Sequence, residues 1–262
     1  MSQMTTDTRA IETGHNNKQG GLAVVEMEHV KKSFGNNHVL RDINLVVHKG
    51  ESLVILGQSG TGKSVLIKCI VGLVDPDHGK LVILGQDVSE LKSKDLIELR
   101  KKIGFLFQSG ALYDSMTVRE NLEFPLRRQI HSTPKETIDS LVKEAMRNVG
   151  LAESIDMTPS ELSGGMRKRL GLARTLILKP EIMLYDEPTT GLDPITSKEI
   201  SKLILEVQKI YDTSSVIITH DIDCARRTAN RIIVLKDGIC AAEGSYADLA
   251  NSKDAWIRSF FE

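Results

Sequence analysis

The sequence predicts an α/β fold in which helices cover both faces of a mostly parallel sheet and an α-helical subdomain is inserted between its strands. Short apolar runs of strand length alternate with segments of helical periodicity, an order typical of parallel sheets. Between about 109 and 169 the strand-like runs stop and apolar residues recur at helical spacing instead. This change of period predicts the inserted helical block.

The first half of the chain contains most of the predicted strands. Apolar–polar alternation indicates half-buried strands, and a continuous apolar run such as Ser52–Leu56 indicates a strand buried on both faces. The expected strands are 24–30, 39–47, 52–56, 80–84 and 103–107, with a helix over 64–71.

The second half begins with the helical block and then returns to alternating elements. One amphipathic helix is expected from the apolar positions Ile138, Leu141, Val142, Ala145, Met146 and Val149. Strands are expected at 182–185, 215–218, 231–235 and 239–242, with a helix at 195–210 and a helical extension over 246–262.

Composition and charge exclude several classes of protein. Lys and Arg total 34 against 35 Asp and Glu in 262 residues, so there is no electrostatic case for nucleic acid as a partner. No apolar run approaches the about 20 residues that cross a bilayer, and residues 1–22 lack the apolar centre of a signal peptide. Three cysteines without metal-type spacing are typical of a reduced cytosolic compartment. We expect a soluble chain with a disordered tail over 1–22.

The most specific motif is a glycine-rich loop between a buried strand and a helix. It reads Gly57-Gln58-Ser59-Gly60-Thr61-Gly62-Lys63-Ser64 and matches G-x-x-x-x-G-K-[ST] without gaps. Its glycines let backbone N–H groups face phosphate oxygens, and the helix N-terminus adds a positive dipole end. Lys63 is expected to reach the β- and γ-phosphates and Ser64 to bind Mg²⁺.

A pair of acidic residues ends the buried strand expected at 182–185. Adjacent side chains in a strand point in opposite directions, so Asp186 and Glu187 are expected to have different tasks. Asp186 is the candidate metal ligand, and Glu187, just past the strand, is the candidate to polarise the attacking water.

A second helix start has the composition of an anion-binding site. Ser163 is expected to cap this helix, and Gly164 and Gly165 leave its first N–H groups unobstructed. One ATP needs only one phosphate cradle. A second cradle therefore predicts two copies of the chain that face each other, each offering its Ser163 turn to the other's γ-phosphate.

With these motifs in order, residues 23–245 resemble the ATP-binding subunits of ABC transporters. The resemblance implies a P-loop NTPase (RecA-like) core, an antiparallel β subdomain and hydrolysis of ATP with Mg²⁺. It also implies roles for four further residues. Gln108 matches the glutamine that links Mg²⁺ and water to the membrane subunit, and His220 matches the histidine that contacts γ-phosphate. Asp193, in Gly191-Leu192-Asp193-Pro194, matches the loop that crosses the dimer interface.

Phe34 is the fourth of these residues. It lies where the family stacks an aromatic ring on adenine, although simple core packing is the alternative for an aromatic residue.

The run from Phe107 to Val118 and the motif Ser163-Gly164-Gly165-Met166 are similar to a narrower group, the MCE-associated lipid transporters that include the bacterial Mla phospholipid system. Met166 replaces the usual glutamine and is followed by Arg167-Lys168-Arg169. This resemblance implies phospholipid transport at the cytoplasmic face of the inner membrane. It also implies permease subunits contacted after Gln108, an MCE-type lipid-binding protein and a small regulatory subunit.

Other functions remain open to different degrees. Chromosome-maintenance ATPases insert long coiled coils between the two cradles, and translation factors carry two cassettes, neither of which is found here. A non-hydrolysing ATP-gated module would lack Glu187. The main alternative is an amino-acid or metal importer. At the C-terminus, Trp256, Phe260 and Phe261 either join the core or, as the narrower resemblance favours, dock on the neighbouring subunit.

Overall fold

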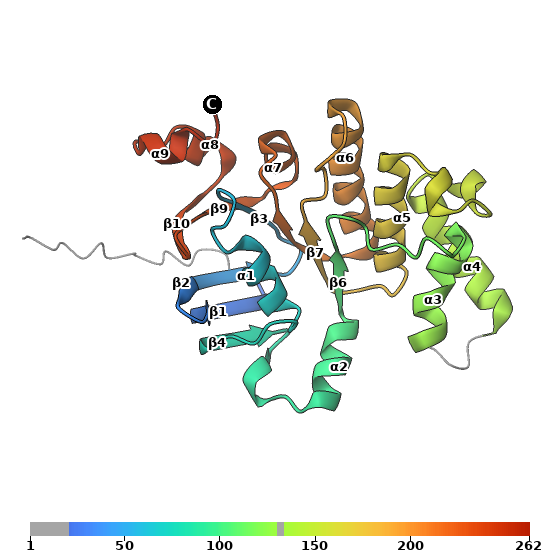
Figure 1. Cartoon of the computed structure of the whole chain (residues 1–262), viewed down its shortest axis with the longest axis horizontal. Helices are drawn as coiled ribbons and strands as arrows, with labels where there is room; N and C mark the ends of the chain where they lie inside the picture. Colours follow the sequence, from blue (N-terminus) through green and yellow to red (C-terminus); the bar gives the residue numbers. More distant parts are fainter. Residues whose placement is uncertain (1–20, 130–133) are drawn as a thin grey trace, which may run out of the picture.

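The computed structural model describes residues 21–129 and 134–262. The strands in these residues form one sheet of ten strands (Figure 1). The strand order is β5-β4-β1-β2-β10-β9-β3-β8-β7-β6. The strands are β1 (Ala23–Phe34), β2 (Asn37–His48), β3 (Ser52–Leu56), β4 (His78–Ile83), β5 (Gln86–Asp87), β6 (Ile103–Leu106), β7 (Ile182–Asp186), β8 (Ser214–Ile218), β9 (Arg231–Lys236) and β10 (Ile239–Gly244).

The sheet has a parallel half and an antiparallel half. Strands β9, β3, β8, β7 and β6 run parallel, whereas β5, β4, β1 and β2 run antiparallel. β10 joins the halves, since it pairs antiparallel with β9 and parallel with β2. Every residue of β3 and β8 is buried, which explains their unbroken apolar or small-residue sequences. The predicted α/β class and its antiparallel subdomain are confirmed.

Helices cover the parallel half, and the inserted block lies at one end of the molecule (Figure 1). The helices are α1 (Lys63–Ile70), α2 (Ser93–Lys101), α3 (Val118–Gln129), α4 (Lys135–Asn148), α5 (Gly164–Leu176), α6 (Pro194–Tyr211), α7 (Ile222–Thr228), α8 (Tyr246–Ala250) and α9 (Ala255–Arg258). Four of these, α1, α4, α5 and α6, lie where the sequence predicts a helix.

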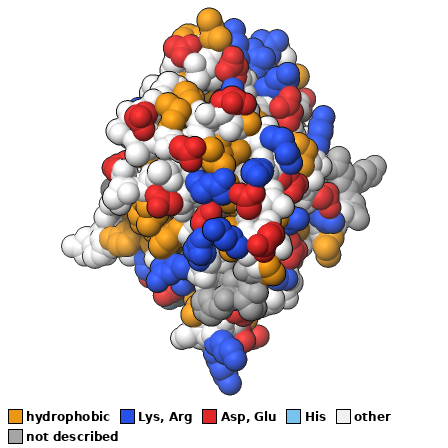
Figure 2. Space-filling view, turned by 90° about the vertical axis from the view of Figure 1, so that its right-hand side faces the viewer, with side chains coloured by type: hydrophobic (Ala, Val, Ile, Leu, Met, Phe, Trp, Pro, Cys, Tyr) orange, Lys and Arg blue, Asp and Glu red, His pale blue; other side chains and the backbone are white. Residues whose placement is uncertain are grey.

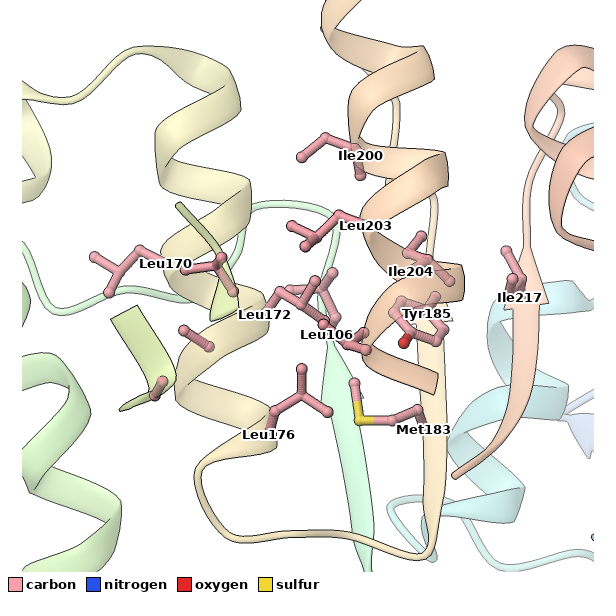
Figure 3. Close-up of a cluster of buried hydrophobic side chains, with 14 of the residues drawn as sticks. Leu106, Leu170, Leu172, Leu176, Met183, Tyr185, Ile200, Leu203, Ile204 and Ile217 are labelled. Atoms are coloured by element: carbon pink, nitrogen blue, oxygen red, sulfur yellow. The ribbon is translucent and has the colours of Figure 1, made fainter. Parts of the chain in front are cut away.

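The helix α5 ties the inserted block to the sheet. Its side chains Leu172 and Leu176 point toward Leu106 of β6 and Met183 of β7 (Figure 3). The subdomain limit expected at 169 therefore falls inside a helix whose second half belongs to the main core.

The C-terminal extension folds back on its own chain. It contains the two short helices α8 and α9, and Trp256, Phe260 and Phe261 pack against the main core. The ammonium of Lys236 lies 4.1 Å from the centroid of the Trp256 ring. All three rings are only partly buried, and their docking on a neighbouring subunit stays a prediction.

Two further expectations concern the ends and the thiols. The expected tail falls outside the described residues except at Gly21 and Leu22, where the Leu22 carbonyl accepts a hydrogen bond from Lys49 N. Cys69 and Cys224 are buried and Cys240 is partly buried, and burial raises the pKa of each thiol.

Among the described helices, none combines the length and apolar character needed to cross a membrane.

Candidate functional site

Four neighbouring parallel strands each end in one of the predicted motifs. β3 leads into the glycine-rich loop, β8 ends before His220, β7 ends at Asp186, and β6 ends two residues before Gln108. The carboxyl ends of parallel strands lie at one edge of the sheet, where open α/β sheets bind ligands. The fold thus brings residues from 57 to 220 into one site.

The phosphate-binding loop is shaped as a cradle. Lys63 is buried, and its Nζ donates to the backbone oxygens of Gly57 at 2.7 Å and Gln58 at 2.9 Å. Gly62 caps α1 with φ of 102° and without a side-chain cap, which leaves the first N–H groups of the helix available to an anion. A Cβ at Gly62 would lie 2.9 Å from the Val39 oxygen, so the close approach requires glycine.

Two carboxyl groups face this loop from the end of β7. Burial, and then the charge of Glu187, raises the pKa of Asp186, while the nearby Lys68, Lys63 and Lys168 act in the opposite direction. Burial likewise lowers the pKa of Lys63, and Glu187 and Asp186 oppose that shift. A cation bound at this edge would relieve the crowding of negative charge, which fits a metal ligand at Asp186.

Glu187 is held in an unusual backbone conformation and a defined orientation. Its φ is 52°, in the left-handed region, directly after the strand ends. One carboxylate oxygen, Oε2, lies 2.8 Å from His220 Nδ1 and accepts from Thr190 Oγ1 at 3.0 Å. Within the described residues these contacts use Oε2 alone, which leaves Oε1 to accept a hydrogen bond from water.

A buried cation behind these groups was not identified from the sequence. Lys168 Nζ donates to the Gln108 carbonyl at 2.5 Å and to the Glu187 carbonyl at 3.2 Å. The side chain of Gln108 itself is exposed. A signal did exist: Lys168 lies four and eight residues before Leu172 and Leu176, on an otherwise apolar stripe of α5.

The second predicted cradle forms as a capped helix start. Ser163 Oγ accepts from Met166 N at 3.2 Å, as expected of the N-cap of α5. The glycines have a further reason that the sequence did not show. A Cβ at Gly165 would lie 2.5 Å from Thr196 Cγ2, and one at Gly164 would lie 3.3 Å from Leu192 Cδ2. The turn therefore packs against the segment that starts α6.

Asp193 caps that neighbouring helix. Its Oδ1 accepts from Ile195 N and Thr196 N, and its Oδ2 accepts from Thr196 Oγ1. These hydrogen bonds lower the pKa of Asp193. Contact between Asp193 and nucleotide stays a prediction.

Phe34 lies at the tip of the β1–β2 hairpin and is 51% exposed. Its predicted alternative, core packing, is therefore wrong. Lys32 Nζ lies 5.3 Å from the ring centroid, and stacking on adenine stays a prediction.

The donor set fits Mg²⁺ held partly by phosphate. In the described part of the chain, no group of three or more His, Cys, Asp or Glu side chains could hold a metal ion. Mg²⁺ commonly takes one or two protein oxygens and completes its shell with phosphate and water. Ser64, exposed at the start of α1, and Asp186 offer such oxygens beside the cradle.

Comparison with known proteins agrees with this geometry. The family model described as "ABC transporter" matches residues 40–190. The chain is 40% identical over 237 residues to the probable ribonucleotide transport ATP-binding protein mkl of Mycobacterium tuberculosis, covering 90% of this chain and 66% of that protein. This chain thus spans slightly less than two thirds of that relative.

Two other relatives belong to different transport systems. The chain is 40% identical to the methionine import ATP-binding protein MetN 2 of Enterococcus faecalis, covering 92% of this chain and 70% of that protein. It is 35% identical to the intermembrane phospholipid transport system ATP-binding protein MlaF of Haemophilus influenzae, covering 91% and 90%.

Solved cassettes share the fold. A dimeric post-hydrolysis ATP-binding cassette bound to ADP and Pi is 33% identical, with a TM-score of 0.77 over 85% of this chain and 98% of that chain. CbiO1 of Clostridium perfringens is 28% identical, with a TM-score of 0.82 over 92% and 95%. The family match, the relatives and the shared fold agree, and the resemblance inferred from the motifs is confirmed: the chain belongs to the ABC transporter family, as one of its ATPase cassettes.

Proposed function

We propose that this chain hydrolyses ATP as a homodimer and powers a membrane transporter. The observation that carries the proposal is the convergence of Lys63, Asp186, Glu187 and His220 at the carboxyl edge of three adjacent strands. A phosphate cradle, a metal ligand, a base and an orienting histidine are the parts that hydrolysis of a phosphoanhydride requires.

Each residue has a task that follows from its place. The N–H groups at the start of α1 and the Lys63 ammonium bind the phosphates, while Ser64, Asp186 and Gln108 would hold Mg²⁺. Bound Mg²⁺ would neutralise phosphate charge as it develops. Glu187 accepts a proton from the attacking water through Oε1, because Oε2 is engaged by His220 and Thr190. His220 thereby orients the base.

The Ser163 turn is the half-site offered to a second copy. It has a capped helix N-terminus, and the side chains nearest to its two glycines are Leu192 and Thr196. The solved cassette with ADP and Pi is a dimer, which supports this arrangement. ATP held between both halves would favour the closed dimer, and hydrolysis would release it.

The segment after Gln108 is the proposed contact with the permease. Phe107 and Tyr113 are 36% and 42% exposed, and the ring of Tyr113 lies 4.7 Å from that of Phe124 on α3. Arg174 and Arg128 lie over these two rings. The neighbouring face displays hydrophobic side chains among mixed charges (Figure 2). Exposed aromatics flanked by arginine are typical of protein interfaces.

We propose phospholipid as the transported molecule, with the chain peripheral at the cytoplasmic face of the inner membrane. The sequence from Phe107 to Val118, Met166 and the similarity to MlaF support this assignment. An MCE-type protein and a small regulatory subunit would complete that system. Import of a small solute such as methionine is the second candidate, favoured by the 40% identity to MetN 2.

Purification of the chain with its permease, followed by mass spectrometry of bound molecules, distinguishes these substrates. Bound phospholipid, together with ATPase activity that phospholipid vesicles stimulate and methionine does not, is the expected result. Stimulation by methionine without bound lipid would favour the importer. A Glu187→Gln complex serves as the control, because its lipid content should not depend on turnover.

A further inference from the structure

The three basic residues that follow Met166 differ in their surroundings. Arg167 Nη1 donates to the Leu162 carbonyl within its own turn, and Arg169 contacts the Val149 carbonyl and Glu199. Lys168 alone of the three is buried, with 7% of its surface exposed. A buried ammonium needs hydrogen-bond partners, and the identity of its partners indicates its task.

The partners of Lys168 lie on two different strand ends. Its Nζ donates to the carbonyl of Gln108 at 2.5 Å, after β6, and to the carbonyl of Glu187 at 3.2 Å, after β7. Burial lowers the pKa of Lys168, and the charges of Glu187 and Asp186 act against that shift. One ammonium thus joins α5 to the residue proposed as base and to the loop proposed to contact the permease.

The contact with Glu187 involves a backbone that needs support. A non-glycine residue at φ of 52° is in an unfavourable, rarely adopted conformation, so neighbouring groups must hold it. Glu187 N donates to the Ile218 carbonyl, and Lys168 holds the carbonyl of the same residue. The peptide on each side of Cα is therefore fixed, and with it the direction of the carboxylate toward His220.

The helix that carries Lys168 is itself firmly held. Leu172 and Leu176 of α5 pack against β6 and β7 (Figure 3). Arg174, also on α5, donates to the carbonyls of Gly110 and Ala111. The segment 108–111 is consequently attached to α5 by two cations, whereas Glu187 is attached to it by Lys168.

We propose that Lys168 is a positioning residue for ATP hydrolysis, which holds the backbones of Glu187 and Gln108 in register with the helix of the Ser163 turn. The inference rests on the proposed function, since it assigns Lys168 to the same site. Loss of the Lys168 ammonium should loosen the two strand ends at Gln108 and Glu187, which are 79 residues apart in the sequence. It should also slow hydrolysis without weakening ATP binding.

The test compares Lys168→Met, which keeps an apolar stem, with Lys168→Arg, which keeps a cation and donors. Arg169→Met is the matched control. Arg169 is the next residue along the same helix, and its cation also donates to a backbone carbonyl, that of Val149. The first readout is hydrogen exchange of the nucleotide-free protein. Lys168→Met should speed exchange at 108–111 and 187–190 about tenfold, whereas Arg169→Met should leave those amides unchanged.

The second readout is steady-state ATPase activity. Lys168→Met should lower kcat about tenfold and change the KM for ATP less than about twofold, with Lys168→Arg recovering most of the loss. Unchanged exchange and kcat in Lys168→Met would overturn the proposal, and so would equal losses in Lys168→Met and Lys168→Arg. If Lys168→Met does not fold, exchange in Lys168→Gln against Lys168→Arg decides the same point. If the wild type and Arg169→Met were both inactive, the proposed function would be refuted instead. The hydrogen-exchange comparison would still test the role of Lys168.

Discussion

The two helix starts of this chain, at Gly62 and at Ser163, use glycine for opposite purposes. Gly62 has positive φ and no side-chain cap, so the first N–H groups of α1 are left for a ligand, beside Lys63 and Asp186. Ser163 caps α5 with its own hydroxyl, and Gly165 is needed for contact with Thr196. The helix start at Gly62 is surrounded by most of the groups that a phosphate site needs. The helix start at Ser163 is packed against its neighbours and offers only its N-terminus to an anion. This difference is the basis of the proposal that two copies of the chain together form one ATP site.

The largest expected effect lies in the first half. Lys63→Ala removes the cation from the cradle and should weaken MgATP binding about 100-fold, since a hydrogen bond to a charged group contributes about 1.5–3 kcal/mol. Titration calorimetry measures the Kd. Lys49→Ala, which removes an exposed cation paired with Asp212, is the control. Unchanged affinity in Lys63→Ala would show that the loop does not bind phosphate.

The second half should affect assembly and leave ATP affinity alone. In Gly165→Ala the new Cβ meets Thr196 Cγ2 at 2.5 Å, so ATP-dependent dimerisation and turnover should fall while the Kd for ATP changes less than about twofold. Adding Thr196→Ser removes that methyl group and keeps a hydroxyl for Asp193, so the double variant should regain dimer and activity. Failure of this rescue would contradict the packing role given to Gly165.

A smaller effect concerns the cap itself. Ser163→Ala should lower the free energy of unfolding by about 1 kcal/mol, the usual value of an N-cap. Urea denaturation measures it. Ser160→Ala is the control, because Ser160 lies just before the helix and, among the described residues, its hydroxyl is hydrogen-bonded to Thr158. A loss of stability as large in the control would mean that Ser163 is not the cap.

The smallest effect separates stability from function at Asp186. Its pKa is raised in the folded state, so the folded protein binds the proton more tightly and stability falls as pH rises from about 4 through the raised value. Asp186→Asn should therefore raise the melting temperature slightly at pH 7 and not near pH 3.5, while Mg²⁺-dependent hydrolysis is lost. Calorimetry at both pH values tests this, and a lower melting temperature at pH 7 would contradict it.

The sequence predicted the strands better than the helices, for physical reasons. β3, β7 and β8 have compact apolar or small-residue runs because both of their faces are buried, whereas α2 and α7 are short and α3 contains Pro125. The loop from Gly57 to Ser64 and the acids after β7 were predictable because their chemistry depends on neighbours in sequence.

Other parts of the site depend on contacts over long separations. Lys168 lies 60 residues from Gln108, and Gly165 lies 31 residues from Thr196, so the sequence does not show which groups these two residues contact, although the apolar stripe of α5 points to the burial of Lys168. The left-handed φ of Glu187 is equally invisible, because glutamate rarely adopts it. These features appear only once β6, β7 and α5 are packed together.

Glu187 is proposed as the base that activates water for the hydrolysis of ATP held between two copies of the chain. Glu187→Gln keeps the contacts of an oxygen with His220 and Thr190 but cannot accept the proton. With MgATP, light scattering after size exclusion should show a stable dimer with two ATP per dimer and no turnover, whereas Lys63→Ala remains monomeric. A Glu187→Gln variant that stays monomeric in ATP, or that turns over as the wild type does, would contradict the claim.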